Sequence, residues 1–149
     1  KLKLSNQVYN SNSLAAIGVA AHEAGHAIQD AKGYTPLNIR ATIVPVANIG
    51  SSFGLPLAIF GFFFNSQFMI GLGLVLFAGA LLFHLVTLPV EFNASNRAIR
   101  QLDRGGYLSK QELNGAKKVL RAAAFTYVAA TLVALANLIR ILLLYNRRR

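Results

Sequence analysis

Three long apolar runs dominate the hydrophobic pattern of the chain. Residues 42–64 contain no charged side chain, residues 68–90 contain only His84 as an ionisable group, and residues 122–145 contain the single charge Arg140. Each run is longer than the about 20 residues that cross a hydrocarbon core as a helix. Core helices of soluble proteins rarely extend so far without a polar face. The pattern therefore predicts three membrane-spanning helices.

The order of these runs predicts a topology. Only Asn65–Gln67 separates the first two, so they should form a helical hairpin whose open ends, near Arg40 and Glu91, lie on one side of the membrane. The segment 91–121 follows on that side. Together with the basic residues before the first run, it carries most of the chain's 15 Lys and Arg residues. The positive-inside rule places this side in the cytoplasm, although Arg147–Arg149 fall on the other side.

The basic segment 91–121 has the signals of two helices joined by a short break. Gly105-Gly106 is expected to end the first helix, and Ser109 with Glu112 forms a capping box that opens the helix leading into the last span. Aromatic residues are scarce in this segment, and it contains no nucleic-acid-binding motif. Its charge is therefore assigned to topology and lipid headgroup contact, and no nucleic-acid partner is expected.

The composition changes this picture little. Of the 149 residues, 54% are apolar and 13% are charged, against about 45–50% and about 25% in typical globular domains. The 15 basic and 5 acidic residues give a net charge of +10. The hydrophobicity excludes intrinsic disorder, and the absence of cysteine excludes a disulfide scaffold and thiolate metal ligands. We expect an all-α fold, a polytopic membrane helical bundle that forms a single domain over residues 1–149.

A polar cluster, His22-Glu-Ala-Gly-His26, lies in an otherwise apolar stretch before the first span. We expect a helix over 13–31, because this stretch has no Pro and Ala is its commonest residue. On a helix, the two His side chains share a face with Cβ atoms about 5–6 Å apart, where two neutral imidazoles can bind one Zn²⁺. Glu23 lies beside them, as the general base does in HExxH metallopeptidases. A structural histidine pair is the alternative, but ionisable groups in an apolar helix are costly to bury unless they are paired or bound to metal.

Catalytic zinc takes three protein ligands and keeps a fourth position open. Asp30 is poorly placed for the third position, because it would reach back over both imidazoles. Asp103 and Glu112 lie among basic residues. Glu91 stands alone at the end of the second span, on the expected side of the membrane, where its alternative role is an ion pair with a nearby arginine. His84 is its rival, although a polar contact between helices is the favoured role for His84.

Two strings, Gly18–Gln29 (GVAAHEAGHAIQ) and Thr87–Ala98 (TLPVEFNASNRA), resemble the YugP-type family of prokaryotic membrane zinc metallopeptidases. Residues 43–50 and the Ala-rich last span resemble it too, so the similarity covers nearly the whole chain. The resemblance implies Zn²⁺ as the cofactor and four site residues, with His22, His26 and Glu91 as zinc ligands and Glu23 as the catalytic base.

The resemblance has two further implications. Related HtpX and CAAX prenyl protease groups usually carry an Asp four residues after the ligand Glu, where it supports a ligand His. Here that position is Ser95, so Asn93 or Ser95 is expected to take the supporting role. Members of the family also carry a further spanning helix before the region where this chain begins, so the chain is expected to be the C-terminal part of a longer protein.

These observations predict a membrane-embedded zinc endopeptidase. Its expected substrates are membrane-associated or misfolded proteins, with the zinc site at the cytoplasmic side of a prokaryotic cytoplasmic membrane. The alternatives are a catalytically silent zinc-binding scaffold, against which the intact Glu23 argues, and a subunit of a larger membrane protein complex. Gly50 and Gly54 have the GxxxG spacing that can support a homo-oligomer or another membrane-protein partner, but packing within the chain is favoured.

Overall fold

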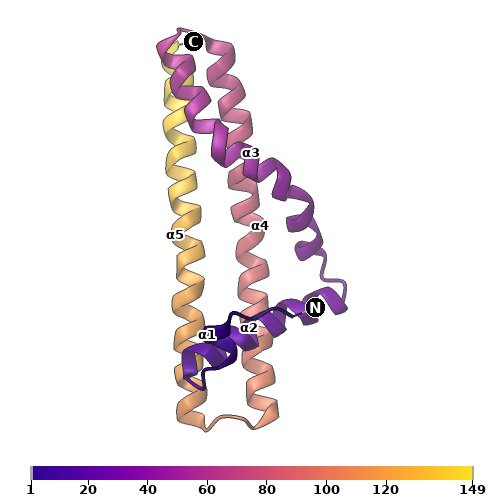
Figure 1. Ribbon diagram of the computed structural model, residues 1–149. Coiled ribbons are helices and arrows are strands. Elements are labelled where there is room, and N and C mark those ends of the chain that lie inside the picture. Colours follow the sequence, from indigo (N-terminus) through magenta and orange to yellow (C-terminus); the bar gives the residue numbers. More distant parts are fainter. Residues whose placement is uncertain (1, 149) are drawn as a thin grey trace. The chain divides into compact units, whose positions relative to one another are not determined.

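The computed structural model describes residues 2–148, and in these residues every regular element is a helix. Lys1, Arg149 and the side chain of Arg148 lie outside the described residues. The contribution of these three residues to the predicted charge distribution therefore lies outside them too. The helices are α1 (Asn6–Tyr9), α2 (Leu14–Ala31), α3 (Thr35–Phe63), α4 (Gln67–Gly105) and α5 (Lys110–Arg148) (Figure 1). The predicted all-α fold is confirmed.

Three of these helices are long and apolar enough to cross a membrane, namely Thr35–Phe63, Gln67–Gly105 and Lys110–Arg147. Their number agrees with the prediction of three helices that can span a membrane. The last two, α4 and α5, also include the basic segment, and α4 continues through Pro89.

The chain divides into two compact units. One consists of Lys1–Asn38 and Leu88–Thr126 and is called the α2 unit here; the other consists of Ile39–Thr87 and Tyr127–Arg149 and is called the α3 unit. Both α4 and α5 contribute a half to each unit.

Local signals explain where the helices of the α2 unit begin and end. The Ser13 side chain accepts a hydrogen bond from the Ala16 backbone N–H and caps the start of α2. The helix ends before Gly33, which adopts a positive φ of 63° that glycine tolerates without strain. At the start of α5, the Glu112 carboxylate accepts from the Ser109 backbone N–H and the Ser109 hydroxyl accepts from the Glu112 N–H, which is the predicted capping box.

Within the α3 unit, glycines allow α3 and α4 to pack closely. A Cβ on Gly50 would collide with the backbone carbonyl of Leu76, and one on Gly61 would lie 2.8 Å from the backbone nitrogen of Ile70. Small residues that let backbones approach are the usual device of membrane helix pairs. A Cβ on Gly54 would lie 3.0 Å from the backbone nitrogen of Phe77, so both glycines of the GxxxG pair, Gly50 and Gly54, serve packing within the chain, as favoured from the sequence.

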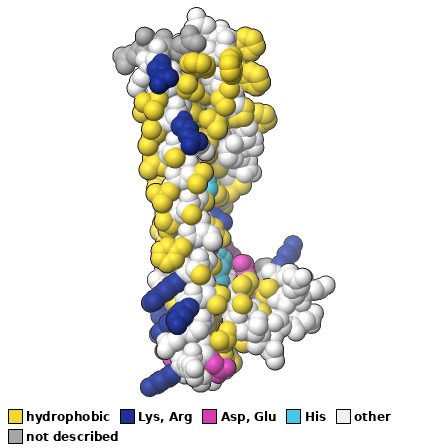
Figure 2. All heavy atoms as spheres, turned by 90° about the vertical axis from the view of Figure 1, so that its left-hand side faces the viewer, with side chains coloured by type: hydrophobic (Ala, Val, Ile, Leu, Met, Phe, Trp, Pro, Cys, Tyr) yellow, Lys and Arg dark blue, Asp and Glu magenta, His cyan; other side chains and the backbone are white. Residues whose placement is uncertain are grey.

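The outer surface of the α3 unit is apolar. Its core is a cluster of Ala58, Ile70, Phe77, Ala134 and Ile141. Large apolar side chains are exposed around that core, and the space-filling view has them gathered on the face of α5 that belongs to this unit (Figure 2). Such a surface suits a hydrocarbon surrounding and not water.

Within the α2 unit, α2 lies across the second half of α4 and the first half of α5 (Figure 1). A Cβ on Gly25 would collide with the backbone carbonyl of Ala94, so α2 and α4 are in contact at this point. Gly18 faces the side chains of Val119 and Leu120 on α5 at ordinary van der Waals distance. This packing brings one face of α2 against the second half of α4.

Candidate metal centre

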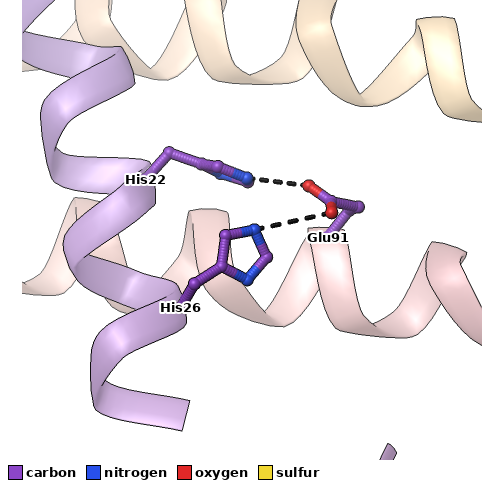
Figure 3. Close-up of side chains that lie close together, drawn as sticks. All are labelled: His22, His26 and Glu91. Atoms are coloured by element: carbon purple, nitrogen blue, oxygen red, sulfur yellow. Dashed lines mark hydrogen bonds and ion pairs between the residues drawn. The ribbon is translucent and has the colours of Figure 1, made fainter. Parts of the chain in front are cut away.

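Three side chains that the sequence singled out converge in the α2 unit. His22 Nε2 lies 2.7 Å from Glu91 Oε2, and His26 Nε2 lies 3.4 Å from Glu91 Oε1 (Figure 3). One potential ligand atom from each of the three lies within 4.8 Å of the other two. Among the described residues, this is the group of His and acidic side chains arranged to hold a metal ion, and it includes neither Asp30 nor His84.

The two histidines owe their proximity to helical spacing. They are four residues apart on α2, so their side chains emerge on the same face. Their ring centroids lie 4.7 Å apart with the ring planes at 90°. The rings therefore do not stack flat, and each turns its Nε2 toward the same carboxylate (Figure 3).

Glu91 supplies the third donor from α4 and is only 2% exposed. A carboxylate buried to this degree needs charged or hydrogen-bonding partners. The two carboxylate oxygens of Glu91 each face one histidine, Oε2 toward His22 and Oε1 toward His26. Of the two arginines nearest in the sequence, Arg97 Nε donates to Asn93 Oδ1 at 2.7 Å, and Arg100 Nε donates to the Asn96 carbonyl at 3.4 Å.

The Nδ1 atom of each histidine has a partner of its own. His22 Nδ1 lies 3.0 Å from the Ser95 hydroxyl, and His26 Nδ1 lies 2.9 Å from Gln29 Oε1. Because Nδ1 is engaged on both rings, Nε2 is the atom that faces Glu91. Metal-binding histidines are commonly oriented in this way by a hydrogen bond to the other ring nitrogen.

Ser95 was one of two residues expected to support a ligand histidine, and its hydroxyl lies at His22. The other, Asn93, does not touch a histidine but contacts Gln29. Gln29 itself was missed by the sequence analysis. A signal was present, because Gln29 is three residues after His26 and so shares its face of an otherwise apolar helix.

Glu23 is half-buried beside the donor group. It lines a cavity of about 450 Å³ together with His26, Asp30 and the N-terminal residues Leu2 and Lys3. A general base must be within reach of a water and of the reacting group, and Glu23 shares an open cavity with one of the donor histidines.

The hydrogen bond to the Glu91 carboxylate raises the pKa of His26 above the ordinary value of 6.5, while burial opposes this shift. A proton on His26 Nε2 and a metal ion would occupy the same position. Protons and metal therefore compete at this nitrogen.

Comparison with known proteins bears on what this arrangement is for. Residues 1–146 match the family described as "Putative neutral zinc metallopeptidase". The chain belongs to this family. It is also 46% identical over 148 residues to the "Putative membrane protease YugP" of Bacillus subtilis (strain 168). That alignment covers 99% of this chain and 66% of the relative, so the chain spans somewhat less than two thirds of the relative's length. No solved structure matches the chain.

Membership of the family confirms the resemblance found in the sequence and implies Zn²⁺ as the cofactor. The donor group fits that ion. Two imidazole nitrogens and one carboxylate oxygen are a ligand set that catalytic zinc uses, and three protein ligands leave one position open. The geometry supports the fit independently, because both Nδ1 atoms are hydrogen-bonded and both Nε2 atoms converge on the buried carboxylate.

Proposed function

We propose that this protein is a membrane-embedded zinc endopeptidase in which His22, His26 and Glu91 hold Zn²⁺ and Glu23 is the catalytic base. The observation that carries the proposal is the convergence of the three donors beside a cavity that Glu23 lines. The family description and the name of the Bacillus relative support a peptidase. The role of each residue rests on the geometry of the site.

The chemistry divides between the metal and the chain. Zinc, when bound, supplies an electrophile for the peptide carbonyl and makes a water molecule acidic at neutral pH. The chain supplies the proton transfers: Glu23 accepts the proton of the attacking water and returns it to the leaving amine. His22, His26 and Glu91 are held in place by helix packing and by hydrogen bonds of the two imidazoles, so they need little rearrangement to bind the metal.

The substrates we propose are membrane-associated or misfolded proteins, presented to the site as extended segments. Support comes from the location of Glu91 on α4, a candidate span, and from the open cavity of about 450 Å³ at Glu23. We place the site at the cytoplasmic side of a prokaryotic cytoplasmic membrane. The support is the excess of Lys and Arg in the segment that contains Glu91 and in the residues beside α2.

The first experiment measures the zinc content of the purified protein alongside the His22→Ala and Glu91→Ala variants. We expect one zinc per chain in the wild type and loss of zinc in both variants. Glu112→Gln is the matched control for Glu91, because Glu112 is an exposed carboxylate at the start of α5 that accepts a hydrogen bond from the Ser109 backbone N–H and does not belong to the donor group. Zinc lost with His22 but kept with Glu91→Ala would move the third ligand to His84 or Asp30.

Glu23→Gln then separates an enzyme from a scaffold. The amide keeps the shape of the side chain but cannot take a proton, so zinc should stay bound while hydrolysis of an unfolded protein such as casein falls by about 10²- to 10⁴-fold. A wild-type protein that binds zinc but cleaves neither casein nor membrane-protein segments would favour the silent scaffold or a subunit of a larger complex.

A further inference from the structure

Gln29 is fully buried at the last turn of α2. Both ends of its amide are engaged. Its Oε1 lies 2.9 Å from His26 Nδ1, and its Nε2 donates to the Val90 carbonyl at 2.8 Å and to Asn93 Oδ1 at 3.0 Å. One side chain of α2 thus links a candidate metal ligand to two residues of α4.

The orientation of this amide follows from its neighbours. Arg97 Nε donates to Asn93 Oδ1 at 2.7 Å, and a guanidinium can only donate, so the Asn93 atom at this point must be the oxygen. That oxygen and the Val90 carbonyl both require a donor from Gln29. Gln29 must therefore turn its NH₂ group toward α4, which leaves its oxygen facing His26.

An oxygen facing His26 Nδ1 accepts a hydrogen bond and cannot donate one. Nδ1 must then carry the proton, and Nε2 of the neutral ring is left as the atom with a free lone pair. Nε2 is the atom that faces the Glu91 carboxylate. Ser95 imposes no such choice on His22, because a hydroxyl can donate or accept.

The hydrogen bonds of Gln29 also depend on the position of α4 relative to α2. Its two acceptors, Val90 and Asn93, lie on either side of Glu91 in the sequence. A shift of α2 along α4 would break both hydrogen bonds and separate the histidines from the carboxylate. The contact of Gly25 with the Ala94 carbonyl restrains the same pair of helices.

We propose that Gln29 is a positioning residue that fixes His26 as an Nε2 metal ligand, with the orientation of its amide set by Arg97 through Asn93. This inference rests on the proposed zinc site. It assigns to an amide the task that a carboxylate or a backbone carbonyl commonly performs for metal-binding histidines.

The rival explanation is that Gln29 only packs α2 against α4. Two substitutions separate the explanations. Gln29→Leu removes the acceptor for His26 and the donors for α4. Gln29→Glu keeps the acceptor, removes the donors and places a carboxylate against the Val90 carbonyl and Asn93 Oδ1, which also lowers the stability of the α2–α4 contact. Gln67→Leu is the matched control, because Gln67 also donates to a backbone carbonyl, that of Tyr145 at 3.0 Å, but contacts none of the donors.

The experiment measures the Zn²⁺ dissociation constant by competition with a chelator, the Tm of the metal-free protein, and the visible spectrum of the Co²⁺-substituted protein. We expect Gln29→Leu to weaken zinc binding by about 10- to 100-fold and to change the Co²⁺ spectrum. Gln29→Glu should lower the Tm but keep zinc binding within a few-fold of wild type. Gln67→Leu should leave zinc binding and the Co²⁺ spectrum unchanged.

Three outcomes would overturn the inference. The first is a Gln29→Leu protein that binds zinc as tightly as the wild type does. The second is a zinc affinity that falls in proportion to the Tm in both Gln29 variants, because a residue that only packs the helices predicts this result. If Gln29→Leu does not fold, nitrogen NMR of the zinc-loaded wild type carries the test, and coordination of His26 through Nδ1 is the third. A wild-type protein that binds no zinc at all would instead refute the proposed function.

Discussion

The two units use the same packing device for different purposes. In the α3 unit, Gly50 and Gly61 let α3 approach α4, and the surrounding side chains are apolar. In the α2 unit, Gly25 lets α2 approach α4 next to a group of polar side chains. The residues buried or half-buried there include His22, His26, Gln29, Glu91 and Ser95. Close approach serves dispersion contacts in one unit and hydrogen-bond and ligand geometry in the other.

The two kinds of contact therefore tolerate displacement of the helices to different degrees. Apolar packing loses stability gradually when helices are forced apart, because each lost contact is worth only about 0.1–0.2 kcal/mol. A ligand set fails abruptly, because hydrogen bonds weaken steeply once their geometry is lost and metal sites must be held within about 0.5 Å. Equivalent glycine substitutions should therefore have different consequences in the two units.

The largest effect is expected from Gly25→Ala. The new Cβ would collide with the Ala94 backbone carbonyl, which cannot move as a flexible side chain can, so α2 must shift from α4. We expect zinc affinity to fall by more than about 100-fold, beyond the loss of one hydrogen-bond partner of a ligand. Chelator competition measures it.

Gly18→Ala is the control for this prediction on the same helix. Its Cβ would meet only side-chain atoms at 3.8 Å and 3.9 Å, which is ordinary contact. It should bind zinc as the wild type does. Equal zinc affinity in Gly25→Ala and Gly18→Ala would contradict the view that the α2–α4 contact sets the ligand geometry.

A smaller effect, of another kind, is expected from Gly50→Ala in the α3 unit. Its Cβ would collide with the Leu76 backbone carbonyl, and overpacking of this type costs about 1–3 kcal/mol of stability. Zinc affinity of the folded protein should not change. Thermal unfolding followed by circular dichroism in detergent, together with a zinc titration, measures both quantities.

Gly79→Ala serves as the comparison within the α3 unit. Its Cβ would lie 2.9 Å from a methyl carbon of Val46, at the end of a side chain that can adjust. The helix-propensity gain of about 1 kcal/mol over glycine should offset much of that cost. If Gly50→Ala weakened zinc binding as much as Gly25→Ala does, the α3–α4 contact would affect the ligand geometry as strongly as the α2–α4 contact does, which would contradict the comparison.

The parts of the molecule that could be predicted from sequence are those in which local spacing decides the structure. The lengths of the apolar runs predicted three helices that could span a membrane, the Ser109–Glu112 box predicted the start of α5, and the spacing of His22 and His26 predicted a shared face. Each of these depends on residues within a few positions of one another.

The remainder depends on which helices meet. The hydrogen bonds of Gln29 to Val90 and Asn93 join residues 61 and 64 positions apart, and no local pattern encodes such a contact. Glu91 stood out only by elimination and by resemblance to a family. Glu91 is buried next to the histidines because Gly25 packs directly against Ala94. This contact between two helices is visible only in the three-dimensional structure.

The smallest effect is expected at Ser95, and it sharpens the comparison within the α2 unit itself. The Ser95 hydroxyl lies 3.0 Å from His22 Nδ1 but does not dictate which ring nitrogen carries the proton. Ser95→Ala should therefore weaken zinc binding by about 10-fold at most, at the low end of the range for such partners. Ser95→Asp should bind zinc at least as tightly as the wild type, because a carboxylate at this position accepts from Nδ1 and makes the ring a better ligand. Chelator competition on the two variants decides the matter: a Ser95→Asp protein that binds zinc more weakly than Ser95→Ala would mean that the hydroxyl donates to His22 and that His22 does not bind the metal through Nε2.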